Sequence, residues 1–154
     1  MAEPGPSAPS PNVLRARRLL AGGAIGGHVA LAVCVVGFGV SGGTLSAVSA
    51  AIAGILTIAF FTIGQAVQVL VADAEPGRVL LAALLSYAGR MGVLGVLLAL
   101  ALANRERLAG MDPVAVVVTT IAVVAGWLAA EIRVFARLRI PVFDETERQG
   151  PGEP

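Results

Sequence analysis

The side chain in this sequence best suited to chemistry or binding is an arginine that lies inside an apolar stretch. Arg90 stands within Leu84–Ala103, which is otherwise almost wholly apolar. A guanidinium stays protonated in proteins, and a charge at the centre of a bilayer costs about 2.5–3.5 kcal/mol on insertion scales. Such a residue faces the interior of a helix bundle or a water-filled cavity, where polar groups accompany it.

Other polar residues occur at similar depth in the neighbouring apolar stretches. Counted at 1.5 Å per residue from the basic end of each helix, Arg90 lies about 16 Å and His28 about 14 Å along its helix. Gln65 and Gln68 are i, i+3 neighbours on one helix face, and Glu131 lies near the basic end of the last stretch. The predicted intramembrane polar layer consists of Arg90, Glu131, Gln65, Gln68, His28 and Tyr87.

Three roles fit the residue types in this layer. It could fix helix register through interhelical hydrogen bonds, worth about 0.6–2 kcal/mol each. It could form a proton or ion path, or Arg90 could face a partner protein. Our hypothesis for the register role is that Arg90 donates to Glu131 and to one of the glutamines. His28 alone is more often a hydrogen-bonded packing residue than a ligand.

The sequence lacks the patterns of an enzyme or of a metal site. It contains no phosphate-binding loop, no Ser-His-Asp set and no paired carboxylates of a catalytic cleft. One histidine and one cysteine, Cys34, do not make a transition-metal site, and a lone cysteine excludes an intrachain disulfide. The net charge of +1 gives no indication of nucleic-acid binding. We therefore predict a protein that is not an enzyme and has no metal or cofactor.

The composition is that of a membrane protein. Of the 154 residues, 56% are hydrophobic and 14% charged, against about 45–50% and about 25% in soluble domains. Four apolar stretches reach the roughly 20 residues that a membrane-spanning helix needs. The breaks between them are short, which favours antiparallel neighbours. We predict an all-α membrane protein with four transmembrane helices in an antiparallel bundle, over residues 19–40, 45–71, 79–103 and 113–134.

The two ends of the sequence differ from this membrane domain in composition. Residues 1–13 are rich in Pro, Ser and Ala, and residues 144–154 are charged and end in Gly and Pro. Both are predicted to be disordered tails, which leaves 14–143 as the transmembrane domain. A cleaved signal peptide is the alternative for the first stretch, but its apolar run is long for a signal core and three further spans follow.

The arginines predict the orientation in the membrane. Arg105 and Arg107 lie in the third loop, and the first loop is uncharged. By the positive-inside rule, the larger set at the opposite end places both termini in the cytoplasm, so we predict a multi-pass protein of the cell membrane. That set comprises Arg15, Arg17, Arg18, Arg78, Arg133, Arg137 and Arg139.

Small residues recur at the spacing that lets membrane helices approach closely. Packing within the bundle is the simpler interpretation, and docking to another membrane subunit is the alternative. The predicted packing residues are Gly22 and Gly26, Gly23 and Gly27, and the row Ser46, Ala50 and Gly54.

The ends of the fourth stretch carry their own signals. Asp112 is a plausible N-cap, and Pro113 suits the first helical turn. At the other end, Arg133, Arg137 and Arg139 interleave with apolar residues, which predicts a basic amphipathic extension along the inner membrane surface. The alternative is that this segment is the end of a helix and is exposed to solvent. In both cases Pro141 would terminate the helix.

The last third of the chain resembles ATP synthase protein I and its relatives, small four-helix proteins encoded beside the membrane sector of actinobacterial ATP synthases. The matching residues include Pro113 with Ala115, Thr119, and Trp127 followed by Ala129 and Ala130, with Arg133 on exit. Upstream, "SYAGR" with Arg90 resembles the third helix of the family. The acidic "VADAEP" after the second stretch departs from relatives that carry basic residues there.

The resemblance implies a non-catalytic accessory role in the bilayer. Members of the family are thought to help assemble the ring of c subunits, and a role in magnesium supply has been proposed. The expected partners are lipid and ATP synthase membrane subunits. The alternative is a small Mg²⁺ or proton carrier or channel that forms a homo-oligomer, with Arg90, Glu131, Gln65 and His28 as its polar path.

Overall fold

The computed structural model describes residues 10–138, and every element in this range is a helix. Three of the helices are long and apolar enough to cross a membrane, by length and composition: α1, α2 and α4. The predicted all-α class with membrane-spanning candidates is thus confirmed. The bounds are Pro11–Leu70 for α1, Pro76–Ala103 for α2, Arg105–Leu108 for the short α3 and Pro113–Arg137 for α4.

The N-terminal end of the chain becomes helical earlier than predicted. α1 begins at Pro11, inside the predicted tail 1–13, because Ser10 caps it by accepting a hydrogen bond from the Val13 amide at 3.2 Å. The predicted tail 144–154, like Arg139 and Pro141, lies outside the described residues.

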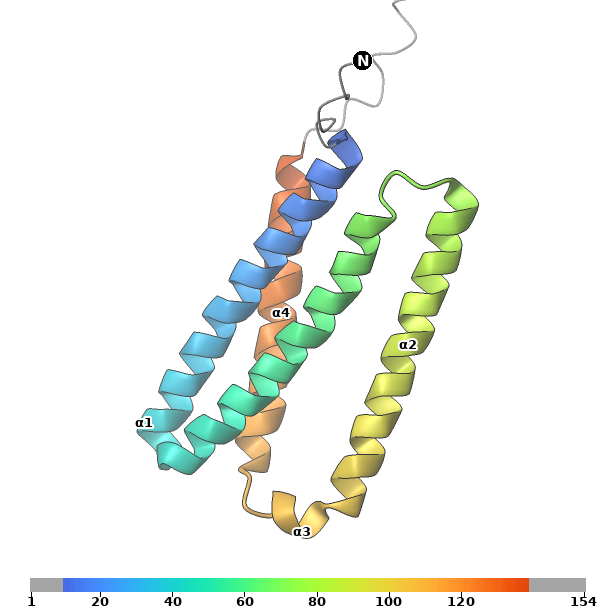
Figure 1. Ribbon diagram of the computed structural model, residues 1–154. Coiled ribbons are helices and arrows are strands. Elements are labelled where there is room, and N and C mark those ends of the chain that lie inside the picture. Colours follow the sequence, from blue (N-terminus) through green and yellow to red (C-terminus); the bar gives the residue numbers. More distant parts are fainter. Residues whose placement is uncertain (1–9, 139–154) are drawn as a thin grey trace, which may run out of the picture.

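α1 folds back on itself at Gly43, so that it consists of two antiparallel arms (Figure 1). Gly43 has φ 76° and ψ −168°, a conformation that glycine adopts readily and other residues do not. The reversal lies within the stretch "SGGT", where the sequence predicts a break between helices. We call residues 11–42 the first arm and residues 44–70 the second arm.

α4 packs against both arms of α1 and forms the core with them (Figure 1). Trp127 is fully buried, with its ring close to Gly23 and Gly27 of the first arm and 5.4 Å from the Phe61 ring of the second arm. The core centres on Ile58, Val123 and Trp127.

Glycines allow the first arm and α4 to approach at backbone distance. A Cβ built on Gly126 would lie 2.8 Å from the Gly26 carbonyl oxygen, and one built on Gly26 would overlap the Gly126 carbonyl oxygen. Gly22 likewise faces Val134. The four predicted packing glycines of the first arm therefore all face α4, whereas Ser46, Ala50 and Gly54 are buried on the second arm.

α2 is attached to the rest only along one side. Its backbone lies close to the second arm of α1 and to the short α3 but not to α4, although Leu94 and Leu97 of α2 line a cavity together with Thr120 and Val124 of α4 (Figure 1). Among the α2 residues whose exposure the structure describes, none is buried. The bundle is thus a compact group of two arms and α4, with α2 on its edge.

Asp112 ties the start of α4 to the second arm. As predicted, it is the N-cap, and its Oδ1 accepts from the amides of Val114 and Ala115 at 3.0 and 3.1 Å. Ser46 donates to Oδ2 at 2.6 Å, and the Asp112 amide donates to the Ser49 hydroxyl at 3.0 Å. The Ser46 hydroxyl and the two amides stabilise the carboxylate and lower the pKa of Asp112, against a smaller opposing effect of desolvation.

The approach of Gly26 to α4 can be tested by adding one methyl group. Gly26→Ala should lower stability by about 1–3 kcal/mol, because the added methyl would overlap the Gly126 backbone, which cannot turn aside as a flexible side chain could. Gly37→Ala on the same arm is the matched control, since a Cβ there meets no atom within 4 Å. Thermal unfolding of both variants in detergent measures the difference. Equal midpoints would contradict the close contact.

Asp112 should make stability depend on pH in the acidic range. Because its pKa is lower in the folded chain than the ordinary 3.8, its stabilising effect is complete above that value. The effect is lost as the pH falls through the lower, folded pKa. Asp112→Asn keeps a capping oxygen but does not titrate. The thermal midpoint of the native chain should therefore fall toward, or below, that of the variant under acid, whereas parallel curves would contradict this role.

Candidate functional site

The six polar residues of the predicted layer lie in three separate places. Gln65 and Glu131 meet between the second arm and α4. Arg90, Gln68 and Tyr87 line a cavity between α1 and α2. His28 lies on the surface, away from both groups.

Gln65 and Glu131 form the interhelical hydrogen bond of the bundle interior. The Gln65 side-chain amide donates to Oε1 of Glu131, and both side chains are half-buried. An amide donor on the neighbouring helix gives the carboxylate a partner where water is scarce. This contact links the second arm to α4 near the end of the bundle that carries most of the arginines.

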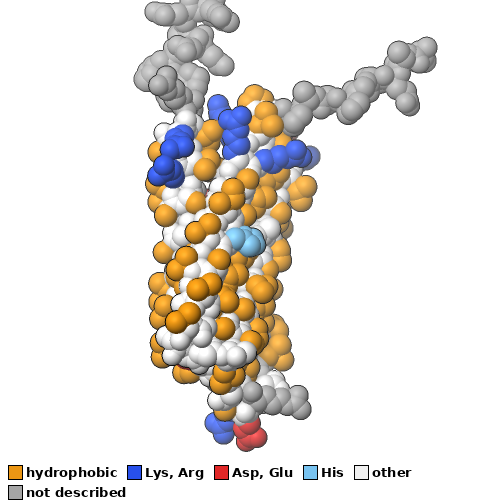
Figure 2. Space-filling view, turned by 90° about the vertical axis from the view of Figure 1, so that its left-hand side faces the viewer, with side chains coloured by type: hydrophobic (Ala, Val, Ile, Leu, Met, Phe, Trp, Pro, Cys, Tyr) orange, Lys and Arg blue, Asp and Glu red, His pale blue; other side chains and the backbone are white. Residues whose placement is uncertain are grey.

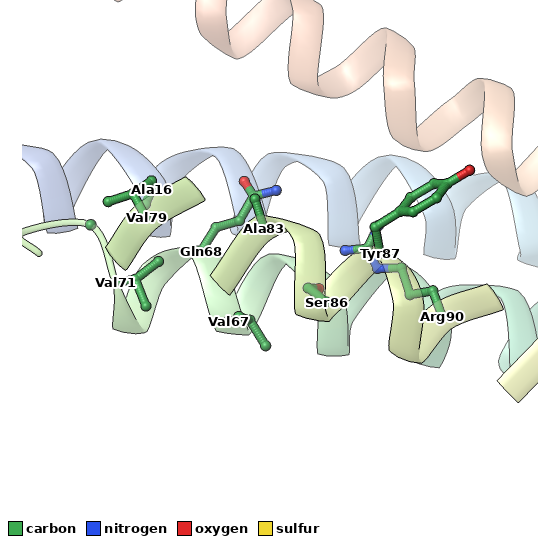
Figure 3. A pocket seen from close by; sticks show the side chains of 10 residues that line it. Ala16, Val67, Gln68, Val71, Val79, Ala83, Ser86, Tyr87 and Arg90 are labelled. Carbon is green, nitrogen blue, oxygen red and sulfur yellow. The ribbon is translucent and has the colours of Figure 1, made fainter. Parts of the chain in front are cut away.

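The cavity beside Arg90 has a volume of about 440 Å³ and is open on one side. It lies between the start of the first arm, the end of the second arm and the first half of α2 (Figure 3). Ser86, Tyr87 and Arg90 come from α2, and Gln68 comes from the second arm. The remaining lining residues are alanines and valines, so Arg90 is the one charged side chain among the described lining residues.

Arg90 packs its guanidinium on the backbone of the second arm. A Cβ built on Gly64 would overlap this group, so only glycine leaves room for it. The guanidinium carbon lies 5.6 Å from the centroid of the Phe60 ring, within the range of a cation–π interaction. Nε is buried and has no hydrogen-bond partner in the described part of the chain. The guanidinium is therefore held by packing and lacks an acceptor at this nitrogen.

The hypothesis that Arg90 donates to Glu131 is wrong. The carboxylate accepts from Gln65 instead, and the backbone of α2, which carries Arg90, does not come close to that of α4, which carries Glu131. The second arm lies between them. Arg90 thus joins two helical segments and not four.

His28 points away from the other polar residues. Its side chain is exposed, and Nδ1 lies 2.7 Å from the Ala24 carbonyl oxygen of its own helix. It lines a shallow groove between the two arms, with Thr62 on the opposite side. Figure 2 shows it on the outer face of the molecule. His28 therefore satisfies one ring nitrogen locally and does not line the Arg90 cavity.

Two residues of the site, Phe60 and Gly64, are not among those predicted from the sequence. Gly64 directly precedes Gln65 in "TIGQ", and a glycine beside a polar residue in an apolar helix can indicate a close approach of another group. Nothing in one sequence identifies Arg90 as the approaching group, because the neighbours of a helix are not encoded in its own pattern.

Arginines gather at one end of the bundle. Arg15, Arg18 and Arg137 line a common depression, which brings together the start of α1 and the end of α4. Figure 2 shows basic side chains grouped there, and basic and acidic side chains at the opposite end. Ser10 donates to Asp73 at 2.5 Å, which joins the α1–α2 loop to the same end.

Residues 10–138 contain no group of three His, Cys, Asp or Glu side chains that could hold a metal ion. Comparisons of the chain with protein-family models, with curated proteins and with solved structures gave no match.

The Gln65–Glu131 contact can be tested with two glutamines of the same helix. Gln65→Leu should lower stability by about 0.6–2 kcal/mol, because it leaves the Glu131 carboxylate without its interhelical donor. Gln68→Leu is the matched control and should change stability by less than about 0.5 kcal/mol, because Gln68 is exposed. Thermal unfolding in detergent measures both, and equal losses would contradict a specific role for Gln65.

Proposed function

We propose that this protein is a non-catalytic membrane accessory protein that acts by associating with another membrane protein. The observation that carries the proposal is the position of α2. This apolar helix of 28 residues packs against one arm of α1, buries none of its described residues, and presents an arginine beside an open cavity. A helix that packs on only one side within its own chain is suited to packing against a helix of a partner protein.

In the proposed membrane arrangement the chain crosses the bilayer four times. Each arm of α1 exceeds the roughly 20 residues that a span requires, as do α2 and α4. Both termini face the cytoplasm, which is supported by the arginines grouped at that end (Figure 2). Arg105 in α3 lies at the other end, next to Glu106.

The proposed partner is the membrane sector of the ATP synthase, with assembly or stability of the c-subunit ring as the role. The partner identity rests on the resemblance of the last third of the chain and of "SYAGR" to ATP synthase protein I. The packing of the four glycines of the first arm against α4 leaves α2 as the side that a partner would contact.

A Mg²⁺ or proton carrier receives less support from the geometry. Such a path would need Arg90, Glu131, Gln65 and His28 to line one route. Glu131 is bonded to Gln65, and His28 lies in a different groove from Arg90. A fixed guanidinium in the cavity also repels cations.

Affinity capture of the tagged, full-length chain from mild detergent tests the proposal. ATP synthase membrane subunits should be recovered with the native chain. Ala83→Trp, which fills the cavity on α2, should reduce their recovery about fivefold or more, which corresponds to about 1 kcal/mol of association.

The matched control is Val33→Trp, which adds the same ring to an exposed position of the first arm. It should leave recovery unchanged. A native preparation without synthase subunits would refute the partner, and equal recovery with both tryptophan variants would refute the role of α2.

A further inference from the structure

The unsatisfied guanidinium of Arg90 points to the chemistry of the partner. We propose that Arg90 receives a carboxylate carried near the bilayer midplane by a transmembrane helix of another protein, which docks over the cavity between α2 and the first arm. This inference rests on the proposed function, because it describes the partner that α2 accepts.

The described chain supplies no carboxylate for Arg90. Glu131 accepts from Gln65 on the far side of the second arm. The other carboxylates among residues 10–138 lie in loops or at helix ends: Asp73, Glu75, Glu106 and Asp112. Nε of Arg90 remains buried without an acceptor, and such a group is costly in a medium of low dielectric constant. The positive charge of Arg90 therefore has no carboxylate partner in the described chain, and a carboxylate from outside the chain could supply one at the side of the guanidinium that faces the cavity.

The depth of Arg90 favours a protein acceptor over a lipid phosphate. Arg90 follows Val79 by eleven positions, or about 16 Å of helix, in a hydrocarbon layer of about 30 Å. Lipid phosphates lie at the surface of that layer, whereas a side chain on a transmembrane helix can lie at any depth. A carboxylate can accept two parallel hydrogen bonds from a guanidinium, which is the strongest pairing available to Arg90.

The shape of the cavity suits a helix that lies over it. Ala16 of the first arm and Ala83 and Ser86 of α2 are small, so they allow close approach of another backbone. The cavity of about 440 Å³ holds a few side chains and not a helix. The partner would therefore insert a carboxylate side chain toward Arg90 while its backbone stays outside.

A second copy of this chain does not fit the same surface. A two-fold symmetric contact over the cavity would bring Arg90 of one copy toward Arg90 of the other, and like charges repel. Each Glu131 is already bonded within its own bundle. Charge complementarity therefore favours a different protein as the partner, with an acidic residue at the same depth in the bilayer as Arg90.

Synthetic transmembrane helices test this inference with the full-length protein. The probes are Leu-Ala peptides of about 23 residues with one central Glu, with Gln at the same position, or with Glu moved two turns toward one end. Association is measured by fluorescence energy transfer in phosphatidylcholine vesicles. The central Glu peptide should bind about three- to twentyfold more tightly than the other two, the range expected for an interhelical polar contact.

Variants test whether Arg90 is responsible for the preference for the central Glu peptide. Arg90→Gln should abolish it and Arg90→Lys should keep part of it, while Arg17→Gln removes a surface charge and should change nothing. Circular dichroism and thermal unfolding establish that each variant is folded. Equal binding of the Glu and Gln peptides to the native chain, or a preference that survives Arg90→Gln, would overturn the inference.

Two further results separate the alternatives. Loss of the Glu preference in vesicles that contain phosphatidylglycerol would mean that Arg90 binds lipid phosphate, and would overturn the proposal. The peptides contain no synthase sequence, so their result is independent of the capture experiment. A Glu preference without recovery of synthase subunits would refute the proposed partner and leave the acidic-helix inference standing.

Discussion

The close approach of the first arm of α1 to α4 is the contact on which the rest of the structure depends. Lipid is as apolar as leucine, so packing and hydrogen bonds, and not the hydrophobic effect, hold helices together in a bilayer. Gly26 and Gly126 bring two backbones together, and that distance allows Trp127 to fill the space between both arms. Asp112 and the Gln65–Glu131 contact then attach α4 to the second arm.

This arrangement leaves the polar groups unevenly satisfied. The carboxylates of Asp112 and Glu131 have donors from neighbouring segments, whereas Nε of Arg90 has none among the described residues. The difference follows from the position of α2, which lies outside the compact group of two arms and α4. A single arginine on the edge helix therefore has an Nε that is unpaired within the described part of the chain, and it lines an open cavity.

The sequence predicts the helical class, the position of the first break and the Asp112 cap, because each depends on local composition or on a short motif. It does not predict which helices are neighbours. α2 is apolar on nearly all sides, so its periodicity does not show that it packs on the second arm and not on α4. For the same reason, similar depth suggested that Arg90 and His28 share a layer, although they face different surfaces.

The tight reversal at Gly43 has a consequence for how the first two segments enter a membrane. Residues 41–44 carry no charged side chain, and no ionisable side chain other than His28 and Cys34 occurs between Arg18 and Asp73. In the proposed orientation, the two arms can enter the bilayer together as a hairpin whose leading tip is only Ser, Gly and Thr. Translocation of this hairpin therefore does not require a fixed charge to cross the hydrocarbon layer. Moving such a charge is the most costly step in moving a polypeptide loop across lipid.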